Sequence, residues 1–172
     1  MNNTGESKGL QILKSLVPYF VIILIIILFK SFIITPVKVV GNSMIPTLDD
    51  GNIMLLDIIS FKLKGADRFD IVVINQGKEL IIKRVIGLPG DSIEYKDSQL
   101  YVNGKEVEDP FVTSYGFTQD LSVKVPKDHY YVLGDNRHNS NDSRTYGPFH
   151  KSQIIGKTDL VLYPFNEFGL RK

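Results

Sequence analysis

Hydrophobic residues are distributed unevenly along the chain, and their distribution divides it into two parts. Residues 16–29 are apolar or aromatic at every position except Pro18. Most of residues 10–13 and all of residues 32–34 are also apolar, so the run extends on both sides. A membrane-spanning helix needs about 20 residues. The run reaches that length only together with its flanks.

Three interpretations fit an apolar segment of this kind. A helix buried in a globular core would show a polar face, and residues 16–29 have none. A cleaved signal peptide would be followed by a small-x-small site, but the sequence continues as Ser-Phe-Ile-Ile-Thr-Pro-Val at residues 31–37. An uncleaved transmembrane anchor over residues 10–35, preceded by a flexible tail at residues 1–9, fits best.

After Pro36 the pattern changes to short extended segments that are separated by turn residues. Asn103-Gly104 supplies the positive φ angles that a two-residue hairpin turn requires. No convincing amphipathic helix is expected after residue 40, apart from a turn around residues 58–64. The sequence thus predicts a mainly β fold, with one N-terminal transmembrane helix before a compact antiparallel, barrel-like β domain at residues 36–172. The expected strands are residues 53–56, 69–74, 79–86, 100–102, 105–107, 122–125, 129–133 and 153–163.

Composition narrows the possible chemistry. Of the 172 residues, 43% are hydrophobic and 23% are charged, which is ordinary for one globular domain. Twenty basic and nineteen acidic residues give a net charge of +1 without a basic stripe, so nucleic acid is not an expected partner. The absence of cysteine excludes disulfides, thiolate nucleophiles and cysteine-based zinc sites. His129, His138 and His150 lack metal-ligand spacing, and neither a metal nor another cofactor is expected.

One serine stands out just after the apolar segment, in Val-Val-Gly-Asn-Ser-Met-Ile-Pro-Thr-Leu at residues 39–48. A serine hydroxyl is a weak nucleophile, so Ser43 needs a base. The candidate is Lys83, which in an extended strand shares one face with Ile81 and Val85. A lysine among branched aliphatic side chains either extends its amine to solvent or is desolvated. A desolvated amine has a lowered pKa and can accept the proton of Ser43.

A third polar cluster occupies residues 134–144, with the sequence Gly-Asp-Asn-Arg-His-Asn-Ser-Asn-Asp-Ser-Arg. Its composition is typical of an exposed turn, because Gly, Asn, Asp and Ser all favour turns. It is also consistent with a polar network behind a catalytic site, with Ser140 holding the Lys83 amine and Asp142 paired to Arg144. Composition alone favours the turn. The serine and lysine suited to catalysis elsewhere in the chain favour the network.

Together these segments resemble the type I signal peptidases, membrane-anchored Ser/Lys endopeptidases that remove signal peptides from exported proteins. A lone Ser-Met-x-Pro would be a weak signal, whereas several blocks in the family's order are specific. With the apolar segment, the resemblance extends from about residue 10 to residue 165. The four matching blocks are residues 41–48, 68–73, 83–91 and 134–144.

The resemblance implies a role for each matching residue. Ser43 corresponds to the nucleophile, Lys83 to the general base, and Ser140 to the serine that orients the lysine. The backbone N–H of Ser43 would be one oxyanion donor. The supporting ion pair and the turn beside it would be formed by Asp142, Arg144, Gly134 and Asp135.

The sequence departs from some family members at one important position. Those members carry a serine two residues before the nucleophile, but Gly41 here has no side-chain donor, so the second oxyanion donor is unassigned. His138 stands where others often have an acid. Only a modest β segment joins residue 91 to residue 134, without the large inserted domain of the Gram-negative enzymes. The resemblance is therefore to the Gram-positive, single-span type.

The implied reaction is cleavage of preproteins after small-x-small sites. Ser43 would attack the scissile carbonyl to form an acyl-enzyme, and Lys83 would then activate water for deacylation. The signal peptide is expected to bind as an extended strand against an exposed sheet edge. Shallow apolar pockets would select small side chains. The expected substrate contacts are Ile82, Gly41 and Met44.

The resemblance also implies a location. Residues 1–9 would lie in the cytoplasm and the catalytic domain on the extracytoplasmic side of the cell membrane, as the family's task implies. The lysines that flank the apolar run are too evenly divided to set the orientation by themselves. An apolar surface beside Ser43 would let the domain rest on the lipid bilayer. A monomer is expected, with signal peptides and the bilayer as partners.

Two other functions are consistent with parts of the sequence. Some self-cleaving repressors use a Ser/Lys dyad on a related β fold, but they carry a DNA-binding headpiece where this chain has an apolar anchor. The alternative from another class is a catalytically inactive, membrane-tethered β module that binds exported proteins. Every expected catalytic position is filled in this sequence, which favours an enzyme.

Overall fold

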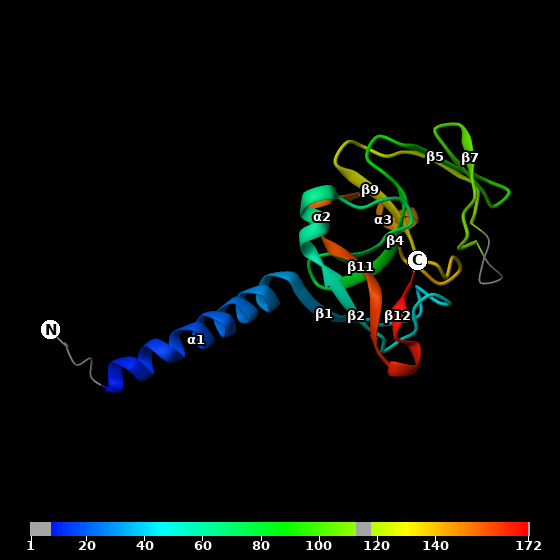
Figure 1. Cartoon of the computed structure of the whole chain (residues 1–172). Helices are drawn as coiled ribbons and strands as arrows, with labels where there is room; N and C mark the ends of the chain where they lie inside the picture. The colour runs from blue at the N-terminus through cyan, green and yellow to red at the C-terminus, as the bar shows by residue number, and fades with distance from the viewer. Residues whose placement is uncertain (1–7, 113–117, 172) are drawn as a thin grey trace.

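The computed structural model describes residues 8–112 and 118–171, and its fold is mainly β (Figure 1). One long helix, α1 (Lys8–Ile33), extends away from a β domain that contains two antiparallel sheets. Helix α1 leads directly into β1 (Ile34–Lys38). The β structure therefore begins two residues before the predicted boundary at residue 36.

Helix α1 carries the apolar segment that was predicted to span a membrane. Large apolar side chains along it, including Leu16, Phe20 and Ile25, are exposed and are not covered by the β domain. In the part of the chain that the structure describes, however, no helix combines the length and the apolarity of a membrane span. The predicted span over residues 10–35 is thus not confirmed, and most of the predicted tail lies outside the described residues.

The larger sheet has eight strands, and it holds the segments that carry the candidate chemistry. Seven of them follow the order β1-β2-β11-β3-β4-β9-β10, and β12 pairs with β11. The strand pairings of this sheet in the described residues are antiparallel, as predicted. The strands after β1 are β2 (Ile53–Asp57), β3 (Ile71–Asn75), β4 (Leu80–Gly87), β9 (His129–Leu133), β10 (Phe149–His150), β11 (Ile154–Tyr163) and β12 (Gly169–Leu170).

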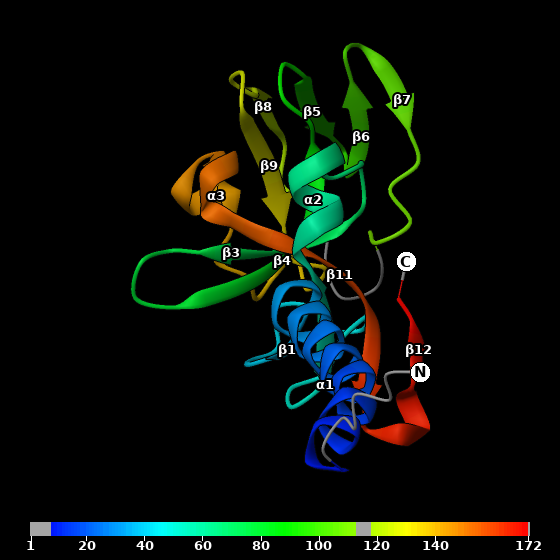
Figure 2. The same ribbon diagram turned by 60° about the vertical axis from the view of Figure 1, so that its left-hand side comes forward.

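The smaller sheet, in the order β7-β6-β5-β8, forms a separate lobe on the side of the β domain away from α1 (Figure 2). Asn103 and Gly104 join β6 to β7 with φ angles of 52° and 76°, which confirms the predicted hairpin. Its strands are β5 (Ser92–Lys96), β6 (Gln99–Val102), β7 (Lys105–Val107) and β8 (Leu121–Lys124). The short helices of the domain are α2 (Ile58–Lys64), α3 (Ser143–Tyr146), η1 (Lys151–Gln153) and η2 (Phe165–Glu167).

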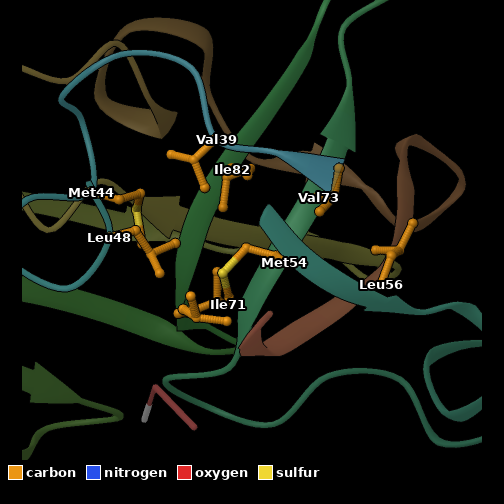
Figure 3. Close-up of a cluster of buried hydrophobic side chains, with 9 residues drawn as sticks. Val39, Met44, Leu48, Met54, Leu56, Ile71, Val73 and Ile82 are labelled. Carbon is orange, nitrogen blue, oxygen red and sulfur yellow. The ribbon is translucent and has the colours of Figure 1, made fainter. Parts of the chain in front are cut away.

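One hydrophobic cluster fixes the loop between β1 and β2 onto the larger sheet (Figure 3). In β2, Met54 and Leu56 point inward because side chains alternate along a strand. They pack in the same cluster as Val39, Met44 and Leu48, which come from the β1–β2 loop and are almost fully buried. Burying each such side chain contributes about 1.5–3 kcal/mol. The loop is therefore held by its own apolar residues, although it has no regular secondary structure.

Candidate active site

Ser43 lies in the β1–β2 loop, where it is partly accessible between the exposed Asn42 and the buried Met44. Met44, the next residue, is 1% exposed and anchors the loop in the core. Gly41 has a φ of +86°, a conformation that residues with a side chain rarely adopt. The glycine turn before Ser43 and the buried methionine after it thus present the serine hydroxyl at the surface of the sheet.

Lys83 approaches Ser43 from β4. Its amine nitrogen Nζ lies 2.7 Å from Ser43 Oγ and donates a second hydrogen bond, of 2.9 Å, to the carbonyl of Ile82. The side chain is almost completely buried, at 3% exposure. Of the two possibilities left open by the sequence, the structure therefore selects the desolvated amine.

Burial changes the acid–base behaviour of this amine. Desolvation lowers the pKa of Lys83 from 10.5 to about 8, and the negative charges of Asp142, Asp135 and Glu79 only partly oppose the shift. A lysine with this pKa is neutral in roughly a tenth of the molecules at pH 7, far more than a lysine with the usual pKa. Its neutral nitrogen has a lone pair within reach of the Ser43 proton.

The turn after β9 positions the Ser43 loop from the other side. The backbone N–H of Asn136 donates to the Ser43 carbonyl at 3.0 Å, and its side-chain amide donates to the Asn42 carbonyl at 3.1 Å. Gly134 packs so tightly here that an added Cβ would lie 2.2 Å from Ser140 Oγ and 2.5 Å from the Ser43 carbonyl. Only glycine fits at this position without moving the serine backbone.

Asp135 forms a buried ion pair with Arg84, the residue after Lys83. Its two carboxylate oxygens accept hydrogen bonds from Arg84 Nε at 2.8 Å and Nη2 at 2.7 Å, and both side chains are at most 1% exposed. The Thr47 hydroxyl also donates to Asp135. This pair therefore ties together β4, the turn after β9 and the Ser43 loop.

Asp142 and Arg144 form the predicted ion pair, and Asp142 also caps α3. The guanidinium of Arg144 donates to both Asp142 oxygens, at 2.9 and 2.8 Å. Burial alone would raise the pKa of Asp142, but hydrogen bonds from Arg144 and from the Gly134 N–H lower it below its usual value. Asp142 is therefore a carboxylate that fixes the turn at Gly134.

Ser140 differs from its expected arrangement. It was predicted to hold the Lys83 amine, but no hydrogen bond joins the two residues, and the Lys83 amine bonds to Ser43 and to the Ile82 carbonyl. Among the described residues, Ser140 Oγ is buried without a hydrogen-bond partner. Its hydroxyl packs against Gly134, so it lies at the site without the predicted contact.

A second buried network was not anticipated from the sequence. Arg137 donates through Nε to the Gly134 carbonyl at 3.0 Å and pairs with Asp109 at 2.8 Å. The Tyr95 hydroxyl also donates to Asp109, and Arg137 donates to the Thr118 hydroxyl at 2.7 Å. Asp109 lies 28 positions before Arg137 in the chain, so their pairing leaves no local sequence signal. The network connects the smaller sheet to the turn that holds Ser43.

A groove of about 270 Å³ runs past the serine and the lysine, and we call it the catalytic groove. The groove is lined by three segments: the Ser43 loop, the hairpin from Gln76 into β4, and the segment leading into α3. The three predicted substrate contacts, Gly41, Met44 and Ile82, all line this groove. In residues 8–112 and 118–171, no group of three or more histidine or acidic side chains is arranged to bind a metal.

Comparison with known proteins gives a consistent result. The family described as "Signal peptidase, peptidase S26" matches residues 12–163. The chain is 40% identical to signal peptidase I S of Bacillus subtilis over 97% of both chains. It is 37% identical to signal peptidase IB of Staphylococcus aureus over 92% of this chain and 93% of that protein. A crystal structure of a signal peptidase I from Enterococcus faecalis covers 55% of this chain and 97% of its own, with 34% identity and a TM-score of 0.49.

The family match spans most of the chain, which therefore belongs to the signal peptidases of peptidase family S26. The protein is a serine peptidase, and its reaction is the cleavage of signal peptides from preproteins. The resemblance inferred from the four sequence blocks is thereby confirmed, and the catalytically inactive module is set aside.

Proposed function

We propose that Ser43 is the nucleophile and Lys83 the general base of this peptidase. The observation that carries the proposal is the 2.7 Å contact between Lys83 Nζ and Ser43 Oγ, made by an amine that burial holds near a pKa of 8. A general base must lie within about 2.6–3.2 Å of the proton it removes, and its pKa must be near the working pH. Lys83 meets both conditions.

The reaction follows from these positions. Neutral Lys83 accepts the proton as Ser43 Oγ bonds to the carbonyl carbon of the scissile peptide, and the Ser43 backbone N–H donates to the resulting oxyanion. Protonated Lys83 then gives its proton to the leaving amine, the peptide C–N bond breaks, and an acyl-enzyme remains. Lys83 next takes a proton from water, which attacks the ester carbonyl carbon. Lys83 then returns this proton to Ser43 Oγ as the ester bond breaks, and the signal peptide leaves with a new C-terminal carboxyl group. Asp142, Arg144 and Ser140 act through the Gly134 turn as positioning residues.

The activity should depend on pH through the Lys83 amine. Because the protonated form cannot act as a base, kcat/KM is expected to fall below about pH 8 and to rise as Lys83 is deprotonated above it. The measurement is a profile of preprotein cleavage between pH 6 and 10. A rate that does not change across this range would exclude Lys83 as the general base.

We further propose that the signal peptide adds as a strand to β4. Strand β4 pairs with β9 only from Arg84 onward, so residues 80–83 have an unpaired edge beside Ser43 among the described strands. An exposed edge provides backbone groups to an extended peptide, and the neighbouring pockets select its side chains. Gly41, Met44 and Ile82 would then form the walls that admit small residues before the cleaved bond.

We also propose that residues 10–35 anchor the chain in the cell membrane, with the β domain on the extracytoplasmic side. The run of apolar and aromatic residues at 16–29, which only Pro18 interrupts, and the uncovered apolar side chains of α1 support this proposal. The full chain should float with liposomes and resist carbonate extraction, whereas a chain lacking residues 1–33 should do so much less. Equal flotation of both chains would contradict anchoring by α1.

A further inference from the structure

The catalytic groove continues into a second groove of different character, which we call the apolar groove. The apolar groove has a volume of about 560 Å³ and is lined from β1, β2, the start of α2 and β11. Four residues line both grooves: Val40, Glu79, Leu80 and Ile82. Because these residues are shared, an extended peptide in one groove can continue into the other.

The position of α1 indicates which part of a substrate occupies the apolar groove. β1 follows directly after α1 and supplies Thr35 to Lys38 to this groove, so the apolar groove lies at the end of the domain where α1 joins it (Figure 1). The apolar part of a signal peptide precedes its cleavage site. The residues upstream of the cleaved bond should therefore extend from Ser43 toward the apolar groove.

Glu79 lies at the junction of the two grooves and is the acidic side chain that lines both of them. It is four residues before Lys83, which corresponds to about 13 Å along an extended strand at ~3.3 Å per residue. An extended substrate has the same rise, so the residue near Glu79 is the fourth or fifth before the cleaved bond. The Glu79 side chain is exposed, and among the described residues no ion pair engages its carboxylate.

We infer that Glu79 is a specificity-determining residue that favours a basic substrate side chain four or five positions before the cleaved bond. This inference rests on the proposed binding of the signal peptide along β4. A cationic side chain at this place would pair with the free carboxylate, whereas an acidic one would be repelled. Lys38 is the cation that lines the apolar groove beyond Glu79, and it would favour the opposite charge.

The test uses the full-length protein and preproteins that differ only at the fourth or the fifth residue before the cleaved bond. Each position carries Lys, Gln or Glu, and kcat/KM is measured in detergent at low salt. The wild type should cleave the Lys substrate about 3-fold or more faster than the Glu substrate, as expected for an exposed charge pair. In Glu79→Gln the ratio of kcat/KM for the Lys substrate to that for the Glu substrate should be close to one. In Glu79→Lys the Glu substrate should be cleaved faster. Glu94→Lys, on β5 in the smaller sheet and outside both grooves, should behave like the wild type.

The outcomes separate this inference from the proposed function. An unchanged Lys-to-Glu ratio in Glu79→Lys would overturn the inference, provided that the Gln substrate is still cleaved. A wild-type preference for the Glu substrate would also overturn it, and would assign the selection to Lys38. If Ser43→Ala cleaves the Gln substrate as fast as the wild type, the proposed mechanism itself fails.

Discussion

Lys83→Met is expected to remove almost all peptidase activity while the β domain remains folded. Methionine has a similar length and fits an almost fully buried site, but it cannot accept a proton. Loss of general-base catalysis alone costs about 10²–10⁴ in rate, and loss of an activated serine nucleophile costs more because Ser43 then has no partner for its proton. Preprotein cleavage in detergent, with the product N-terminus sequenced, measures the effect.

The same substitution should not weaken the fold at neutral pH. The pKa of Lys83 is lowered from 10.5 to about 8 on folding, so the unfolded chain binds more protons between these values. Stability therefore rises with pH across this window, and below about pH 8 the burial of Lys83 carries its full cost, roughly 3 kcal/mol at ~1.4 kcal/mol per pKa unit. Lys83→Met removes this cost and loses two hydrogen bonds of about 1 kcal/mol each.

A matched variant keeps this prediction falsifiable. Ser43→Ala removes the nucleophile but leaves the lysine in place, so its activity should be as low as that of Lys83→Met while its stability stays dependent on pH. The melting temperature of Lys83→Met at pH 7 should equal or exceed that of Ser43→Ala. Cleavage by Lys83→Met within ten-fold of the wild type would exclude Lys83 as the base.

Arg84→Ala is expected to destabilise the fold by about 3–5 kcal/mol, because it leaves the Asp135 carboxylate charged and buried without its partner. Asp135→Ala should cost a similar amount for the same reason. A domain of this size has a total stability of only about 5–15 kcal/mol, so either variant should be close to unfolding. Urea denaturation followed by circular dichroism measures the change.

A double substitution distinguishes the ion pair from simple loss of packing. Arg84→Met combined with Asp135→Leu fills the site with apolar atoms and strands no charge, so it should be more stable than either single alanine variant. Lys151→Ala, which breaks the exposed pair with Asp128, is the surface control and should leave the stability almost unchanged, because solvent screens an exposed ion pair. Equal effects of Arg84→Ala and Lys151→Ala would contradict the structural role of the buried pair.

Much of the fold could be predicted from local sequence. Alternation of apolar and polar residues identified most of the strands, since residues that alternate in burial must alternate in character. The hairpin turn at Asn103-Gly104 was predicted correctly, because few residue pairs tolerate two positive φ angles. Strands β1, β5, β10 and β12 were not predicted. Strand β1 was missed because Ile34 continues the apolar composition of α1 and carries no signal of its own.

The candidate site was predicted only to the level of residue identity. The types of side chain in the blocks at Ser43, Lys83 and residues 134–144 were sufficient to suggest a serine, a base and a supporting ion pair. Partners were less predictable: Ser140 does not bond to Lys83, and Arg137 pairs with Asp109, far away in the chain. Such pairings depend on how the two sheets and the loops between their strands pack together.

The sequence alone was enough to infer the mainly β class, the family and the residue types of the site, because these follow from local patterns and from short motifs. It left open whether the Lys83 amine reaches solvent or is buried. The answer required the folded structure, since the amine is buried where the Ser43 loop and the turn after β9 pack against β4. That closure lowers the pKa of the amine, and the energy of a charge in an apolar site depends on its whole surroundings rather than on its neighbours in the chain.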